Sequence, residues 1–130
     1  MSHLVIIALG SNSRQNAHIQ WATQRTASLL EQVSFSKVLW TKDVKGSGHL
    51  YMNRLVAGYT ELAVDEIEQI LKSYEVECHR TLEQITIDLD LMLYDEKRYH
   101  LRDWPRPYIS LLLPELFLNK EASMDATKRK

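Results

Sequence analysis

Cysteine, proline and glycine are scarce in this chain, and no hydrophobic run is long. The 130 residues include one cysteine, four glycines and three prolines. Because a lone thiol cannot form an internal disulfide, Cys78 fits a reducing compartment, and we expect a cytoplasmic protein. The apolar run at residues 4–9 is too short to span a membrane and follows no basic segment, so we predict neither an anchor nor a signal peptide.

Excess charge of either sign is also lacking, since 16 basic and 17 acidic side chains leave a formal net charge of −1. This balance provides no overall field to attract nucleic acid or an anionic membrane, and we expect neither as a partner. The five histidines form no HxH or HxxxH pair, which argues against a histidine-built zinc site. At this length the chain forms one domain, which we place at residues 1–119 with a polar tail at 120–130, and we expect a monomer.

The most informative stretch is residues 85–94, in which apolar and polar side chains alternate. A strand here has two faces: Ile85, Ile87, Leu89, Leu91 and Leu93 on one, and Thr86, Asp88, Asp90, Met92 and Tyr94 on the other. Asp88 and Asp90 then share a face, with Cα atoms roughly 6.5–7 Å apart. Two carboxylates this close repel, and a divalent cation is one means of offsetting the repulsion. The alternative is a solvated outer face whose charges only keep the sheet soluble.

Hydrophobic periodicity elsewhere predicts three further strands and two helices. The strands fall at residues 4–9, 35–41 and 53–60, the helices at about 16–32 and 64–76, a loop at 42–50, and a short helix or extended segment at 109–118. The order β-α-β-β-α-β predicts an α+β, ferredoxin-like fold, with both helices on one face of an antiparallel sheet and an open substrate face. The leucine side of the last strand must then meet the helices, which leaves Asp88 and Asp90 on the open face.

Three short motifs lie at the ends of these elements. Gly10-Ser11-Asn12 ends the first strand, Tyr51-Met52-Asn53 opens the third, and the segment from Glu75 to Arg80 leads towards the strand with the two aspartates. In this order the motifs resemble the 6-hydroxymethyl-7,8-dihydropterin pyrophosphokinase family of folate biosynthesis, over roughly residues 4–118. The resemblance implies Mg²⁺-dependent transfer of pyrophosphate from ATP to a pterin, 6-hydroxymethyl-7,8-dihydropterin.

The resemblance also implies roles for individual residues. Asp88 and Asp90 match the aspartates that hold two Mg²⁺ ions, and with Arg80 they make up the catalytic set. Three residues match the pterin pocket: Thr41, Tyr51 and Asn53. Glu75 and Arg80 match the nucleotide side, where Arg106 is a further candidate for balancing phosphate charge. We add Lys72, one helical turn before Glu75, as a nucleotide contact, with a solvated helix lysine as the alternative.

Departures from the family pattern leave other functions open. Only residues 81–87 separate Arg80 from Asp88, and Ile85 lies where a second catalytic arginine is expected. A family Pro-His-Pro becomes residues 105–107, Pro-Arg-Pro, and Tyr108 is the nearest counterpart of a missing arginine. Since phosphoryl transfer depends on positioned positive charge, a catalytically impaired homologue that binds nucleotide or pterin is one alternative. An unrelated ferredoxin-like interaction domain is another.

Overall fold

The structure, a computed structural model, describes residues 2–43, 48–81 and 84–116. Its strands and labelled helices are, in chain order, β1 (His3–Ser11), α1 (Gln15–Ala27), β2 (Glu31–Phe35), β3 (Leu39–Lys42), β4 (Leu50–Thr60), α2 (Val64–Glu77), β5 (Asp88–Tyr94) and β6 (Lys97–Arg98). The strands form one antiparallel sheet in the order β2-β4-β1-β5-β6, with β3 also paired to β4. This arrangement confirms the α+β, ferredoxin-like fold. No helix within the described ranges has the length and apolar character needed to cross a membrane.

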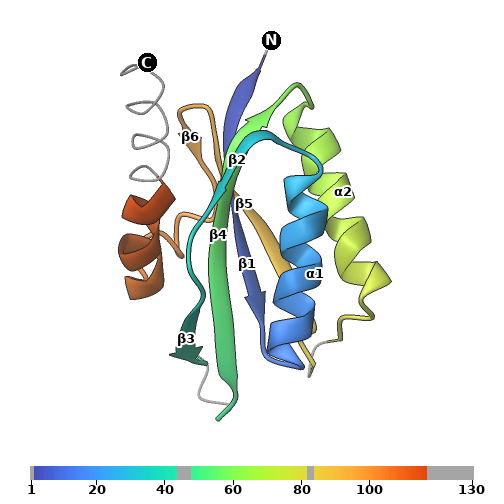
Figure 1. Cartoon of the computed structure of the whole chain (residues 1–130), viewed down its shortest axis with the longest axis vertical. Coiled ribbons are helices and arrows are strands. Elements are labelled where there is room, and N and C mark those ends of the chain that lie inside the picture. Colours follow the sequence, from blue (N-terminus) through green and yellow to red (C-terminus); the bar gives the residue numbers. More distant parts are fainter. Residues whose placement is uncertain (1, 44–47, 82–83, 117–130) are drawn as a thin grey trace, which may run out of the picture.

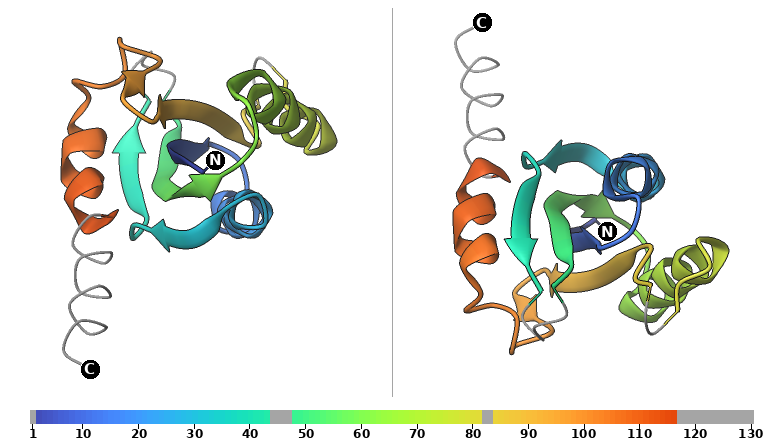
Figure 2. Two further views of the ribbon diagram at one scale, coloured as in Figure 1. Left: turned by 90° about the horizontal axis from the view of Figure 1, so that it is seen from above. Right: turned by 90° about the horizontal axis from the view of Figure 1, so that it is seen from below.

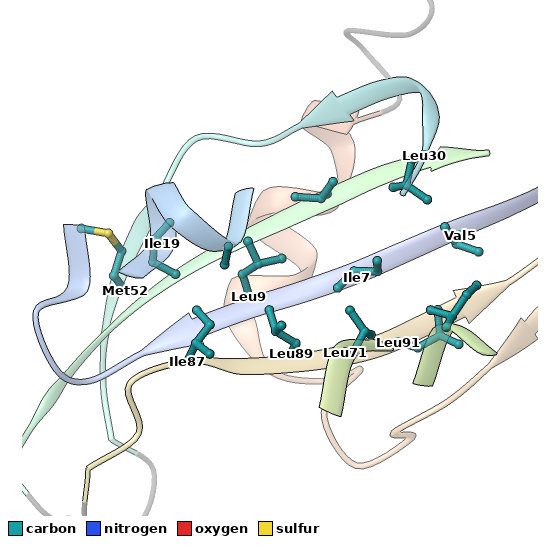
Figure 3. Packing of buried hydrophobic residues seen from close by; sticks show 13 residues of the cluster. Val5, Ile7, Leu9, Ile19, Leu30, Met52, Leu71, Ile87, Leu89 and Leu91 are labelled. Carbon is teal, nitrogen blue, oxygen red and sulfur yellow. The ribbon is translucent and has the colours of Figure 1, made fainter. Parts of the chain in front are cut away.

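Strand β1 lies at the centre of the sheet because its apolar run can be buried on both faces. Val5, Ile7 and Leu9 point towards α1 and α2, where they pack with the apolar residues of β5 (Figure 3). Ile6 and Ala8 point the other way, into a second cluster. All five are at most 5% exposed. Truncation of a buried aliphatic side chain of this kind to alanine typically costs about 2–5 kcal/mol of stability.

A third helical segment, residues 107–116, covers part of the second face of the sheet. Ile109, Leu112 and Leu116 recur at helical spacing and are buried against Ile6 and Met92. The segment lies opposite α1 and α2, so the molecule has helices on both sides of its sheet (Figures 1 and 2). The packing expected of residues 109–118 is confirmed as helical up to residue 116, and the remainder lies outside the described residues.

The helix predicted for residues 16–32 is too long, since α1 ends at Ala27. Residues 31–35 belong instead to strand β2, and Gln32 has a positive φ of 52° that no helix accommodates. The prediction failed because Leu29, Leu30 and Val33 continue the apolar spacing after the chain has left the helix. They still pack against the core, although from a turn and a strand.

The single strand predicted at residues 35–41 is two strands, β2 and β3, separated at Ser36. The backbone N–H of Ser36 donates to the carbonyl of Leu55, while the Ser36 hydroxyl accepts the N–H of Leu55. A side-chain oxygen therefore replaces a backbone carbonyl in the ladder, and the chain bends there. Strand β4 also begins earlier than predicted, at Leu50, which removes that residue from the predicted loop. Residues 44–47 of that loop lie outside the described residues.

Strand β5 begins at Asp88 and carries a bulge that the alternating pattern does not reveal. Ile6 pairs with Leu93 and Ile7 with Leu91, so that Met92 is an extra residue on β5. Ile87, Leu89 and Leu91 face the helices as predicted, whereas Leu93 turns to the second cluster and Tyr94 to the first. The prediction of a single alternation through residue 94 is wrong beyond this bulge.

Candidate functional site

Two cavities meet at the start of β5. The first, here the sheet-face cavity, has a volume of about 460 Å³, and its walls include Gly10, Thr41, Tyr51, Asn53, Arg106 and Tyr108. The second, here the α2 cavity, has a volume of about 620 Å³, and its walls include Glu68, Lys72, Glu75, Leu91 and His100. Asp88, Asp90 and Arg80 line both cavities. Ligands bound in the two cavities would therefore face each other across the two carboxylates.

Pairing with β1 places the aspartates at this junction. Asp88 pairs with Gly10 and Asp90 pairs with Ala8. Because Gly10 and Ala8 are small residues, they leave room above both carboxylates. Both side chains line the same cavities, which agrees with the prediction that they share a face. The Asp90 side chain is 25% exposed and that of Asp88 36%.

The carboxyl of Asp90 is strongly perturbed. Burial, followed by the negative charges of Asp88, Asp103 and Glu75 and a hydrogen bond with the Asp88 side chain, raises the pKa of Asp90 to about 8. Neither a lysine nor an arginine in the described ranges forms an ion pair with Asp90. Without a cation the carboxyl is therefore mostly protonated at neutral pH, and a cation that binds there must displace the proton.

Arg80 connects the end of α2 to the first aspartate. Its Nη1 lies 3.0 Å from Glu75 Oε2 and 3.1 Å from Asp88 Oδ1. Glu75 Oε2 also accepts the backbone N–H of Leu89 at 2.8 Å, which attaches α2 to the start of β5, between the two aspartates. Burial of Glu75 raises its pKa, while the Leu89 hydrogen bond and the Arg80 charge act in the opposite direction. The guanidinium is 35% exposed and faces the junction.

Asn53 presents a defined hydrogen-bonding edge to the sheet-face cavity. Its Nδ2 donates to Thr41 Oγ1 at 2.8 Å and to the Leu39 carbonyl at 3.2 Å, since β3 pairs beside β4. These two acceptors set the orientation of the amide. A Cβ at Gly10 would lie 3.6 Å from Asn53 Oδ1 and 3.9 Å from the Tyr51 ring, so that Oδ1 and this ring border the space that glycine leaves open. The structure therefore brings Thr41, Tyr51 and Asn53 together.

Asn12 is a site residue to which the sequence reasoning gave no role. Its backbone N–H donates to the Ile85 carbonyl, and its Oδ1 accepts the Ile85 N–H at 2.8 Å. Its Nδ2 also lies 3.4 Å from the hydroxyl of Tyr51. The turn after β1 thereby holds both the residues before β5 and an aromatic wall of the sheet-face cavity. The sequence Gly-Ser-Asn predicts a turn, but it does not predict that Asn12 will bond to Ile85 and Tyr51, which are distant in sequence.

The segment after β6 supplies further polar groups that sequence patterns did not single out. Asp103 and His100 approach Asp90, and the carboxyl of Asp103 pairs with Arg106 at 3.1 Å. Arg106 lies on the sheet-face cavity, whereas Lys72 and Glu75 lie on the α2 cavity.

Ile85 lies on the sheet-face cavity and not with Ile87 against the helices, which corrects the face predicted for it. Burial, together with the charges of Asp103 and Asp90, raises the pKa of Tyr108 to about 12.

A ferredoxin-like domain in which paired carboxylates and an arginine separate two adjoining cavities has the layout of a transferase that brings two substrates together. Comparison with protein families makes this more specific. The chain belongs to the 7,8-dihydro-6-hydroxymethylpterin-pyrophosphokinase (HPPK) family, whose model matches residues 6–123. The alternative of an unrelated interaction domain is therefore wrong. A search of curated proteins found no match.

Proposed function

We propose that this protein transfers pyrophosphate from ATP to the hydroxymethyl group of 6-hydroxymethyl-7,8-dihydropterin, with Mg²⁺ as cofactor, in the cytoplasm. The observation that carries the proposal is the junction of two cavities at Asp88 and Asp90. Family membership supports pyrophosphate transfer in folate biosynthesis. The assignment of one substrate to each cavity rests on which matched residues line it.

The donor set at the junction fits a hard divalent cation. Asp88 and Asp90 supply carboxylate oxygens, which Mg²⁺ prefers, and Glu75 and Asp103 add negative charge nearby. When bound, Mg²⁺ would neutralise phosphate charge and help align an in-line displacement at the β-phosphorus. Asp88 and Asp90 would hold the ions, with two expected from the family resemblance. Cation binding would also relieve the mutual repulsion of the carboxylates.

The sheet-face cavity suits a flat heterocycle with hydrogen-bonding edges. Asn53 Oδ1 would accept a ring N–H, and the Thr41 hydroxyl, which accepts from Asn53, retains a hydrogen to donate. Tyr51 would pack against the ring from the side that Asn12 supports. A pterin held by these three residues would direct its hydroxymethyl group towards the aspartates. That oxygen would attack the β-phosphorus, and AMP would leave.

The α2 cavity would hold the nucleotide. Lys72 and Glu75 line it from α2, and Arg80, which pairs with Asp88, would balance the charge of the phosphates. The ion pairs of Arg80 with Glu75 and Asp88 position the guanidinium before phosphate arrives. Arg106 would approach the phosphates from the sheet-face side. Its ion pair with Asp103 would then be broken or shared with phosphate.

The test is a product analysis with Mg²⁺, ATP and the pterin substrate. The proposal predicts AMP and a pyrophosphorylated pterin in equal amounts, and no AMP when the pterin is omitted. Asp90→Asn should abolish the reaction, because an amide cannot lose a proton to become an anionic metal ligand, whereas Asp95→Asn, on the exposed turn after β5, should retain it. ADP as the product, or no AMP at high enzyme concentration, would refute pyrophosphate transfer.

A second candidate function is a homologue that binds the same ligands without turning them over. It is favoured by Ile85, which places an aliphatic side chain on the sheet-face cavity where the resemblance leads us to expect an arginine. This candidate predicts calorimetric binding of the pterin and of a non-hydrolysable ATP analogue together with background AMP formation. If Ile85→Arg then raises AMP formation, the missing charge is the cause.

A further inference from the structure

Asp90 belongs to a second group of potential ligands besides its pair with Asp88. His100 and Asp103 approach it from the segment after β6, and one ligand atom from each of the three residues lies within 4.8 Å of the others. His100 Nε2 is 3.7 Å from Asp90 Oδ1. Two ligand atoms that share an ion at about 2.1 Å lie roughly 3.0–3.4 Å apart. The three groups must therefore close by up to about 1.8 Å to hold one cation.

The charges around this group favour the binding of a cation. Asp90 has no lysine or arginine partner in the described part of the chain, and His100 lies beside it with its side chain 44% exposed. Asp103 forms an ion pair with Arg106, and its side chain is 20% exposed. An ion that takes Asp103 as a ligand would compete with that guanidinium. Arg106 would then be released towards the sheet-face cavity, which it already lines.

The imidazole distinguishes this group from an all-oxygen site. Mg²⁺ prefers carboxylate, carbonyl and water ligands in a strict octahedron, whereas an imidazole nitrogen with carboxylates suits first-row transition ions. We propose that Asp90, His100 and Asp103 form a site for a transition-metal ion such as Mn²⁺, which shares Asp90 with the Asp88–Asp90 pair but differs from it in its other ligands and in metal preference. The site binds its ion without nucleotide or pterin. The proposal refines the proposed function by adding a metal position beside the substrate junction, but its binding step does not depend on turnover.

The test is Mn²⁺ binding to the metal-free protein in the absence of nucleotide and pterin. The electron paramagnetic resonance signal of free Mn²⁺ reports occupancy directly. His100→Asn should weaken binding by about tenfold or more, since a ligand is lost. His79→Asn is the matched control. Both histidines are exposed and have a positive φ, 53° and 58°, which asparagine tolerates, but His79 lines neither cavity.

Two further measurements separate this site from a general acidic surface. Excess Mg²⁺ should displace Mn²⁺ far less readily from the unsubstituted protein than from His100→Asn, because only the former has the nitrogen ligand. Arg106→Gln should tighten Mn²⁺ binding, because a competitor for Asp103 is removed. Equal Mn²⁺ affinity in His100→Asn and His79→Asn, or equal preference for Mg²⁺ and Mn²⁺ throughout, would overturn the proposal.

The outcome does not depend on whether the protein is an active pyrophosphokinase. Mn²⁺ binding that requires ATP would overturn the His100–Asp103 site while AMP formation with Mg²⁺ remained intact. Conversely, tight Mn²⁺ binding that requires His100, with no AMP formed under any condition, would support the site and refute the reaction. The two results are read from different assays on the same preparations.

Discussion

Replacement of Asp90 by asparagine should remove a loss of stability that the metal-free protein undergoes as pH rises. The folded protein holds a proton on Asp90 up to about pH 8, whereas the unfolded chain releases it near the ordinary value of 3.8. Because the folded state binds more protons over this interval, stability is highest at the acidic end and falls as pH rises towards 8. Asparagine resembles the protonated acid in shape and carries no charge, so Asp90→Asn should remove this loss.

The size of the effect follows from the difference in pKa. Each pKa unit corresponds to about 1.4 kcal/mol, so the steepest decline is about 1.4 kcal/mol per pH unit. An interval from 3.8 to about 8 sets an upper limit on the order of 5–6 kcal/mol. Asp90 is still 25% exposed, and water that reaches the carboxylate reduces this penalty. We expect Asp90→Asn to be about 2–3 kcal/mol more stable than the unsubstituted protein above pH 8, and equal to it below about pH 4, where Asp90 is protonated in both the folded and the unfolded chain.

Urea unfolding in the presence of a chelator, repeated across this pH range, measures the effect. Asp95→Asn is a control of opposite sign, because the hydrogen bond from His3 lowers the pKa of Asp95 and its carboxylate stabilises the fold at neutral pH. At both positions asparagine replaces an aspartate of nearly the same shape. If the unsubstituted protein is as stable at pH 8 as at pH 5, or if Asp90→Asn keeps the same slope, the assignment of a buried, uncompensated carboxyl is incorrect.

Other substitutions test the core and the two cavities. Gly58→Ala should destabilise the fold by about 1–3 kcal/mol in urea unfolding, because its Cβ would lie 2.8 Å from Leu30 Cβ and 3.0 Å from the Glu31 carbonyl. Gly10→Val should weaken pterin binding in calorimetry by at least about tenfold and leave binding of an ATP analogue unchanged, since its methyl groups would enter the sheet-face cavity. Arg80→Met should lower the rate of AMP formation by about 100-fold or more, because no other described cation joins Glu75 to Asp88; a loss smaller than threefold would exclude Arg80 from the reaction.

The strand alternation in residues 85–94 was sufficient to place both aspartates on one face, because a half-buried strand has a period of two. It could not reveal the bulge at Met92, which depends on how β1 pairs with β5. Likewise, the apolar spacing through Val33 continued across a helix end, because core contacts are made by whichever element carries the side chain. The break at Ser36 depends on one hydroxyl that enters the ladder with Leu55.

The candidate site likewise has residues that the sequence predicted and residues that it did not. Tyr51 and Asn53 belong to one motif, and Thr41 was matched through the family resemblance; the pairing of β3 with β4 explains why these three residues converge. His100 and Asp103 were missed because nothing in the irregular sequence after Tyr94 indicates that the chain returns to Asp90. Such returns depend on the β5–β6 turn and on the packing of residues 107–116. Local patterns do not encode them.

The central claim is that Asp88 and Asp90 form a metal-dependent nucleotide site beside the sheet-face cavity. Calorimetric titration with a non-hydrolysable ATP analogue, with and without Mg²⁺, tests it most directly. We predict binding that requires Mg²⁺, is lost in Asp88→Ala/Asp90→Ala, and persists in Asp95→Asn. Binding of equal strength without Mg²⁺, or in the doubly substituted protein, would contradict the claim.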